Sequence, residues 1–121
     1  MELIKAAREA REVAYAPYSG FQVGSALRAR SGRIFTGCNV ENSSYGLTIC
    51  AERVALSKAV SEGECEFDSI AVCAPGAPTP CGACRQVLNE FCPDLVIFLV
   101  DPQETPVGRV TLKQLLPSAF D

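Results

Sequence analysis

Two short apolar runs with a helical stretch between them constrain the fold of this chain more than any other feature. Residues 69–74 read SIAVCA and residues 95–100 read LVIFLV, and such runs are typical of strands buried on both faces of a sheet. Residues 82–91 place apolar side chains at helical spacing, at Val87, Leu88 and Phe91. A strand, a helix and a strand joined by short connections form a βαβ unit, so we expect the two strands to be parallel.

The rest of the chain supplies elements that cover this unit. We expect an amphipathic helix at 2–15 that ends at Ala16-Pro17, a strand at 22–30, a turn at Ser31-Gly32, a strand at 33–40, a polar loop at 41–49, a helix at 50–61, and a short helix at 112–116 capped by Thr111. Together these elements predict a three-layer α/β/α sandwich with a mixed, mainly parallel sheet. We expect one domain over residues 1–121.

Charge and hydropathy narrow the class of partner. None of the apolar runs approaches the roughly 18 residues that a membrane-spanning helix needs, so no membrane span is expected. The net charge is −3, and the local basic cluster is limited to Arg28, Arg30 and Arg33. A protein that follows a polynucleotide backbone normally carries a larger positive surface. The composition therefore favours a small-molecule ligand over nucleic acid.

The cysteine content indicates thiol or metal chemistry rather than a disulfide framework. The chain has seven cysteines, an odd number, and its first residues show no basic segment followed by an apolar one that would mark it for export. We therefore expect reduced thiols and a cytoplasmic location. The chain has no histidine, so acid–base chemistry falls to carboxylates or thiols.

Two cysteine motifs thirty residues apart predict a zinc site. Cys50 opens one predicted helix, and Cys81 and Cys84 open another. Cysteines three apart at a helix start lie on one face, and a helix N-terminus favours the thiolate. Zinc with three protein ligands keeps a fourth position for water, which distinguishes a catalytic site from a structural one. Glu52 follows Cys50 by two residues and is the candidate to move a proton beside that water.

Other readings of these residues remain open at this stage. The Cys-x-x-Cys pair is also typical of a redox dithiol, and a fourth sulfur would make the zinc site structural. The candidates for a fourth ligand are Cys38, Cys65, Cys73 and Cys92. Phe21 would by default be a core aromatic, and Asn39 and Glu41 would be turn residues that satisfy backbone groups.

The sequence as a whole resembles the small, homotetrameric cytidine deaminases. The resemblance rests on four segments, YSGF at 18–21, GCNVEN at 37–42, CAER at 50–53 and PCGACRQ at 80–86. Cys-x-Glu followed by Pro-Cys-x-x-Cys is the all-cysteine form of the zinc deaminase signature. The resemblance implies hydrolytic deamination of cytidine and deoxycytidine, in which Glu52 passes protons and ammonia leaves, with one zinc ion per subunit.

The resemblance also implies roles for individual residues. Phe21 would pack on the pyrimidine, Asn39 and Glu41 would hold ribose hydroxyls, and Ala51 would line the substrate site. Arg53 would donate hydrogen bonds to the sulfurs that bind zinc. In a homotetramer, Ser43 and Tyr45 would approach a neighbour's ribose, and Phe120 would help close a neighbour's pocket.

Three rival functions share part of this pattern. A non-enzymatic module stabilised by zinc would need a fourth sulfur. A polynucleotide-editing deaminase shares the chemistry but needs a basic groove for flanking nucleotides. A deaminase of nucleoside antibiotics shares the zinc motif and differs in its pocket.

Overall fold

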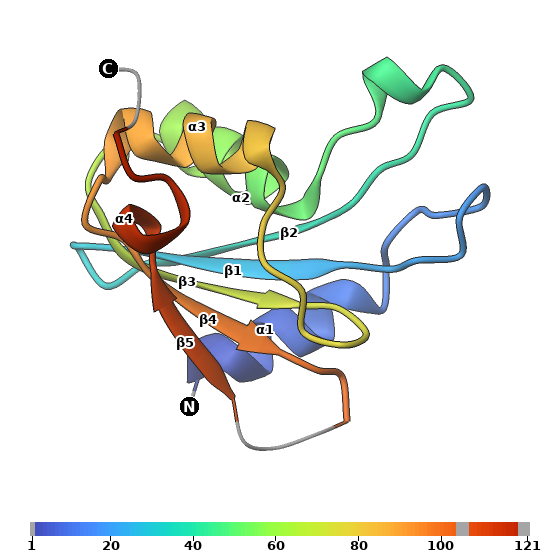
Figure 1. Ribbon diagram of the computed structural model, residues 1–121, viewed down its shortest axis with the longest axis horizontal. Helices are drawn as coiled ribbons and strands as arrows, with labels where there is room; N and C mark the ends of the chain where they lie inside the picture. Colours follow the sequence, from blue (N-terminus) through green and yellow to red (C-terminus); the bar gives the residue numbers. More distant parts are fainter. Residues whose placement is uncertain (1, 104–106, 119–121) are drawn as a thin grey trace.

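A computed structural model describes residues 2–103 and 107–118 of the chain, and Figure 1 shows the arrangement of its elements. The elements are α1 (Glu2–Arg11), β1 (Gly24–Ala29), β2 (Ile34–Cys38), the short 3-10 helix η1 (Tyr45–Leu47), α2 (Ala51–Ser61), β3 (Phe67–Cys73), α3 (Gly82–Phe91), β4 (Val96–Val100), β5 (Gly108–Thr111) and α4 (Leu112–Leu115). No helix in the described part of the chain has the length and apolar character that crossing a membrane would require.

The described strands form one sheet in the order β2-β1-β3-β4-β5. β3 and β4 are parallel, as the βαβ pattern predicts. The pairings β1–β2, β1–β3 and β4–β5 are antiparallel. The sheet is therefore mixed, as expected, but the expectation of a mainly parallel sheet is wrong. The N-terminal half adds a hairpin beside β3, and a hairpin always pairs antiparallel.

Helices cover both faces of the sheet and give the predicted three layers. α1 packs on one face, where Leu3 and Ala7 are fully buried against Ala26, Ala71 and Val100. α2 and α3 cover the other face, around a larger core that includes Leu27, Leu56, Phe67, Ile70, Leu88 and Ile97. In Figure 1 α1 lies on the side of the sheet opposite α2 and α3.

One glycine sets the height of α2 above the sheet. A Cβ atom at Gly37 of β2 would collide with the carbonyl oxygen of Ala51 and the amide nitrogen of Ala55. The first turn of α2 therefore lies directly against the backbone of β2. This close approach fixes the position of the residues that open the helix.

Several element boundaries differ from the predictions. α1 ends at Arg11 rather than at residue 15, because the next amides bond to carbonyls three residues back and form turns, as between Glu12 and Glu9 (3.2 Å). β5 was not predicted from the sequence; GRVT is a short strand at the sheet edge, and two of its four residues are exposed. The predicted cap of the last helix is confirmed, because Thr111 forms a reciprocal capping box with Gln114.

Two segments project from the same end of the sheet, which we call the first arm (residues 13–21) and the second arm (residues 40–49). Figure 1 shows both extending away from the layers. Backbone bonds join them, with Tyr15 bridged to Val40 and the amide of Glu41 donating to Tyr15 (2.9 Å). All the large hydrophobic side chains that are exposed within the described residues lie on these arms: Val13, Tyr15, Tyr18, Phe21, Val40, Tyr45, Leu47 and Ile49.

Candidate active site and metal centre

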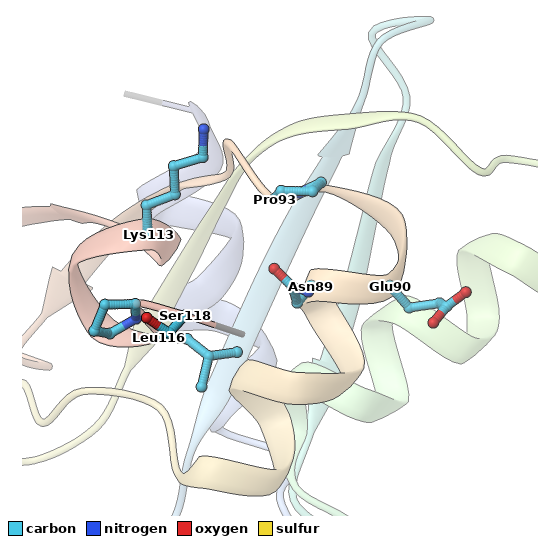
Figure 2. Close-up of a pocket in the computed structure, with 7 residues that line it drawn as sticks. Asn89, Glu90, Pro93, Lys113, Leu116 and Ser118 are labelled. Atoms are coloured by element: carbon cyan, nitrogen blue, oxygen red, sulfur yellow. The ribbon is translucent and has the colours of Figure 1, made fainter. Parts of the chain in front are cut away.

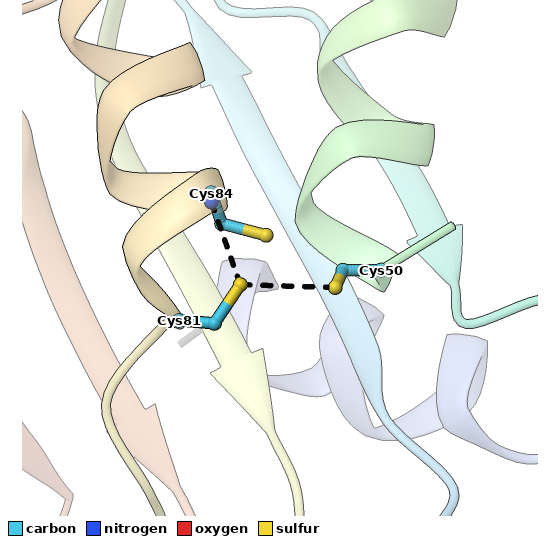
Figure 3. Close-up of side chains that lie close together, drawn as sticks. All are labelled: Cys50, Cys81 and Cys84. Atoms are coloured by element: carbon cyan, nitrogen blue, oxygen red, sulfur yellow. Dashed lines mark hydrogen bonds between the residues drawn. The ribbon is translucent and has the colours of Figure 1, made fainter. Parts of the chain in front are cut away.

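Three cysteine sulfurs meet where α2 and α3 begin. Cys50 is the N-cap residue of α2 and Cys81 is the N-cap residue of α3, while Cys84 lies in the first turn of α3. Figure 3 shows the three side chains pointing toward one another. The sulfurs all lie within 4.8 Å of one another, with 3.9 Å between Cys50 Sγ and Cys81 Sγ. The two motifs that the sequence analysis linked therefore come together in space.

The sulfur cluster fits a zinc ion. Two thiolates that bind one zinc ion tetrahedrally at about 2.3 Å lie about 3.8 Å apart, and the separation of Cys50 and Cys81 is 3.9 Å. Cys84 is fully buried, whereas Cys81 is exposed, so the cluster closes on one side and opens on the other. No fourth sulfur joins the cluster, although all seven cysteines lie in the described residues. The donor set thus leaves one position for a non-protein ligand.

The surroundings of the cluster favour a thiolate at Cys50. The pKa of Cys50 is lowered to about 5, first because Cys84 donates to its sulfur and then because Arg53 does. Arg53 Nη2 lies 3.5 Å from Cys50 Sγ and also donates to the carbonyl of Thr48 (3.4 Å). The same pairing and burial raise the pKa of Cys84, which keeps its proton while no cation is bound. Arg53 therefore lies where the resemblance predicts, beside a ligand sulfur.

Glu52 is the one buried carboxylate beside the sulfurs in the described part of the chain. It lies in the first turn of α2 with 5% of its surface exposed. Burial raises its pKa above the usual glutamate range, and the negative charge of Cys50 adds to this, while Arg53 opposes it. A carboxyl group with a raised pKa can both accept and return a proton near neutral pH. The geometry suits the general acid–base role predicted for Glu52.

A pocket of about 350 Å³ opens beside the sulfurs. This volume is in the range typical of small-molecule sites. Half of the lining residues are apolar, and the others are two cysteines, Glu52 and three uncharged polar residues; the members are Phe21, Val23, Asn39, Thr48, Cys50, Ala51, Glu52, Val72, Ala74, Pro78, Thr79 and Cys81. Phe21, Asn39 and Ala51, all predicted from the resemblance, thus line one pocket with the candidate catalytic group.

The amide of Asn39 ties down the segment that carries Phe21. Asn39 Nδ2 donates to the carbonyl of Phe21 (2.8 Å), and Asn39 Oδ1 accepts from the amide of Val23 (2.9 Å). Asn39 is 8% exposed, so it makes these bonds from a buried position. The default reading of Asn39 as a residue that satisfies backbone groups is therefore confirmed, and one amide hydrogen remains for a ligand.

Glu41 lines an adjoining hollow rather than the pocket itself. This second hollow, of about 320 Å³, is formed by Tyr18, Ser19, Glu41, Asn42, Tyr45 and Thr48. Thr48 lines both spaces, so they are neighbours. The carboxylate of Glu41 accepts from the amides of Tyr18 (3.0 Å) and Ser19 (3.1 Å) and from the hydroxyl of Ser19. These bonds, above all that from the Ser19 hydroxyl, lower the pKa of Glu41 below the usual range.

Ser43 and Tyr45 do not line the pocket of their own chain. Ser43 is exposed on the second arm, and Tyr45 is 82% exposed and contributes only to the adjoining hollow. Phe120 lies outside the described residues. Their roles were predicted for a neighbouring subunit, so within one chain they are not expected at the pocket.

Some lining residues received no role in the sequence analysis. Val72 and Ala74 lie at the carboxyl end of β3, the edge where α/β proteins place their ligands, so the βαβ pattern was a signal for them. Thr79 directly precedes Pro80 of the cysteine motif and accepts from Arg85 (2.9 Å). Ser19 belongs to the YSGF segment, but no spacing rule indicated its hydrogen bonds.

A larger hollow of about 510 Å³ lies elsewhere, between the end of α3 and α4 (Figure 2). Its lining residues are Asn89, Glu90, Pro93, Lys113, Leu116, Pro117 and Ser118. None of these is buried, and Lys113 is paired with Asp94 (2.8 Å). Because this hollow holds neither a ligand cluster nor a buried ionisable group, we assign the active site to the sulfur pocket.

Comparison with known proteins agrees with this geometry. A profile of the family described as the cytidine and deoxycytidylate deaminase zinc-binding region matches residues 1–100. The cytidine deaminase of Halalkalibacterium halodurans is 52% identical over 121 residues, covering 98% of this chain and 91% of the relative. That of Sporosarcina psychrophila is 48% identical over 121 residues, covering 98% and 89%. A crystal structure of cytidine deaminase from Burkholderia pseudomallei, 50% identical, superimposes with a TM-score of 0.93 and covers 98% of this chain and 97% of that one. The chain therefore belongs to the family of zinc-binding cytidine deaminases.

Proposed function

We propose that this chain hydrolyses cytidine and deoxycytidine to uridine and deoxyuridine with release of ammonia, as a step of pyrimidine salvage. The observation that carries the proposal is a cluster of three sulfurs, two of which line a mostly apolar pocket together with one buried carboxylate. Cys50, Cys81 and Cys84 would hold one zinc ion per subunit. When bound, zinc supplies Lewis acidity that makes water nucleophilic near neutral pH.

Glu52 carries the proton transfers. Its raised pKa lets the carboxylate take a proton from the attacking water and give it to N3 of the pyrimidine. As the bond from C4 to the amino nitrogen breaks, the departing amine takes up a proton and leaves as ammonia. Burial of Glu52 keeps bulk water from competing for these protons.

The arms and the start of α2 hold the nucleoside. Phe21 packs on the pyrimidine, and Ala51 closes the pocket beside it with its fully buried side chain. Asn39 donates its remaining amide hydrogen to a ribose hydroxyl. Glu41 accepts from a ribose hydroxyl in the adjoining hollow, which Thr48 connects to the pocket.

The exposed arms support assembly into a homotetramer. The arms carry all the exposed large hydrophobic side chains of the described residues, and apolar surface gathered in one region is typical of protein–protein contacts. In the tetramer, Ser43, Tyr45 and Phe120 complete a neighbour's active site. Light scattering tests the assembly by measuring the molar mass in solution. Leu47→Ser, on the second arm, should lower this mass. Val13→Ser shows whether the first arm also contributes to the subunit contacts. A wild-type monomer would refute the assembly.

We further propose that the chain acts as one catalytic domain in the cytoplasm. In support, the cysteines are all free thiols, which is typical of a reducing compartment. All the strands of the described residues belong to one sheet, and helices cover both of its faces, as in a single domain.

Activity on a panel of nucleosides tests the proposed reaction. The zinc-loaded wild type should deaminate cytidine and deoxycytidine, and Glu52→Gln should lower kcat by about 10²- to 10⁴-fold, the usual contribution of a general acid–base. Zinc measured on the same samples should stay at one ion per subunit. Wild-type protein that leaves cytidine unchanged would refute the proposal.

The same panel separates the rival deaminases. A short cytosine-containing oligonucleotide competes poorly if the substrate is a free nucleoside, because the chain has a net charge of −3 and no lysine or arginine lines the sulfur pocket. A nucleoside antibiotic that carries a cytosine base tests whether the chain is instead a deaminase of nucleoside antibiotics. Turnover of the antibiotic in preference to cytidine would assign the chain to that activity.

A further inference from the structure

Ser19 joins two residues of the proposed nucleoside site by a single hydroxyl group. Its Oγ donates to Glu41 Oε2 and accepts from the amide of Phe21 (3.0 Å). Glu41 lines the adjoining hollow and Phe21 lines the pocket. The hydroxyl therefore forms a direct link between the carboxylate on the second arm and the aromatic residue on the first.

Both backbone polar groups of Phe21 are held by side chains. Its amide donates to Ser19 Oγ, and its carbonyl accepts from Asn39 Nδ2 (2.8 Å). Phe21 itself is 42% exposed and lies outside the regular elements, so packing alone does not fix its ring. The two side-chain bonds thus hold the backbone from which the ring reaches the pocket.

The carboxylate of Glu41 has limited room for a further donor. The amides of Tyr18 and Ser19 both donate to Oε1, and the hydroxyl of Ser19 donates to Oε2. A carboxylate offers about four acceptor sites, so the remaining site is on Oε2. A ligand hydroxyl that binds Glu41 must therefore share this oxygen with Ser19.

We propose that Ser19 is a positioning residue that couples the sugar contact at Glu41 to the placement of Phe21 against the base. This inference rests on the proposed function, because it requires that Glu41 and Phe21 bind the nucleoside. The route runs from the sugar hydroxyl to Glu41 Oε2, to the Ser19 hydroxyl, to the Phe21 amide. In this route Ser19 acts through Glu41 and Phe21.

The chain contains a matched control for this arrangement. Ser31, in the turn between β1 and β2, donates to Glu64 Oε2 (2.6 Å) and accepts from the amide of Arg33 two residues on (3.4 Å). Both serines are exposed, and both bridge a glutamate to the amide at position i+2. Ser31 lies beyond the end of β1 that is opposite the arms (Figure 1). Ser31→Ala thus removes the same pair of hydrogen bonds at a site remote from the pocket and serves as the control for Ser19→Ala.

A double-mutant cycle between Ser19 and Phe21 tests the coupling. Ser19→Ala should lower kcat/KM for cytidine roughly tenfold, the size expected for lost hydrogen bonds that include a charged acceptor, and the loss should appear mainly in KM. Ser19→Thr, which keeps the hydroxyl, should restore it, and Ser31→Ala should match the wild type. In a Phe21→Ala background, Ser19→Ala should change kcat/KM by less than about twofold, because the residue that it positions is absent.

Additive losses in the cycle would overturn the inference, as would an active Ser19→Ala protein equal to the wild type. Amide exchange of Phe21, followed by NMR in the ligand-free protein, supplies a readout without turnover. The Phe21 amide should exchange faster in Ser19→Ala than in the wild type, and at the wild-type rate in Ser31→Ala. A wild-type exchange rate in Ser19→Ala would also overturn the inference. A wild type inactive on every nucleoside would instead refute the proposed function, which is a different result.

Discussion

The two ends of the pocket are built in different ways. At the cluster end, Cys50, Cys81, Cys84 and Glu52 all lie at the N-cap or in the first turn of a helix that packs on the sheet. At the arm end, Phe21 and Glu41 lie on the projecting arms, where side-chain bonds to backbone amides replace a packed core.

The cluster end carries the groups proposed for the reaction, and the arm end carries those proposed to bind the nucleoside. The cluster end is complete within one chain, because three sulfurs and the carboxylate converge without a partner. The arm end depends on hydrogen bonds between side chains and backbone groups of the arms and, in the proposed tetramer, on a neighbour. Substitutions at the cluster end should therefore affect zinc and kcat, whereas those at the arm end should affect KM.

Among the variants that test this difference, Cys84→Ala should have the largest effect on zinc content and activity. Removal of one of three sulfurs should abolish stoichiometric zinc and with it the deaminase activity, because the loss of a ligand exceeds the roughly 10- to 100-fold cost of losing an outer partner. Zinc per subunit and kcat for cytidine measure this. Metal binding also contributes to folding free energy, so the melting temperature should fall.

Cys73→Ala is the control for a buried thiol outside the cluster. Cys73 is fully buried in the layer beneath α1, and burial raises the pKa of its thiol. We expect zinc and kcat to be retained, with a loss of about 1 kcal/mol in the free energy of unfolding. If both variants kept their zinc, the cluster would not be the metal site.

Arg53→Lys should have the next largest effect. Arg53 donates from Nη2 both to Cys50 Sγ and to the carbonyl of Thr48, and the planar guanidinium fixes the directions of these two bonds, whereas the ammonium of a lysine is a point charge on a flexible stem. Zinc affinity, measured by competition with a chelator, should fall roughly 10- to 100-fold. Arg33→Lys, in an exposed ion pair with Glu62 (2.6 Å), should leave it unchanged. An equal response in both would show that Arg53 does not support the sulfurs.

Each half of the cluster could be predicted from the sequence because its geometry is local, and the two halves were joined by their match to the zinc deaminase signature. Cysteines three apart at a helix start share a face whatever the rest of the chain does, and the residue pattern also located α2 and α3. The same local rules predicted the capping box at Thr111. Sheet order could not be predicted in this way, since the pairing of β1 with β3 joins segments far apart in the sequence.

The contacts at the arm end could not be predicted from local sequence patterns. Asn39 and Glu41 were predicted from family resemblance, but their partners Phe21, Val23 and Ser19 lie 16 to 22 residues away in the sequence and become neighbours only in the folded chain. The edge strand β5 was missed for a related reason, because its short and exposed sequence gains its structure from pairing with β4. Tertiary pairing, rather than propensity, decides such segments.

The smallest predicted effect concerns pH at the arm end. The Ser19 hydroxyl and two amides lower the pKa of Glu41 below the ordinary value of 4.5. A carboxylate with a lowered pKa makes its contribution fully above the ordinary value and loses it as pH falls through the lowered one. The KM for cytidine should therefore be higher in Glu41→Gln than in the wild type by a constant ratio above pH 4.5, and the ratio should shrink in more acid solution. Measuring KM for both proteins at each pH cancels the titration of groups that they share, including Glu52 at the cluster end. A ratio that already declines between pH 7 and pH 5 would mean that Glu41 titrates above its ordinary range, and that the donors on the first arm do not hold its charge.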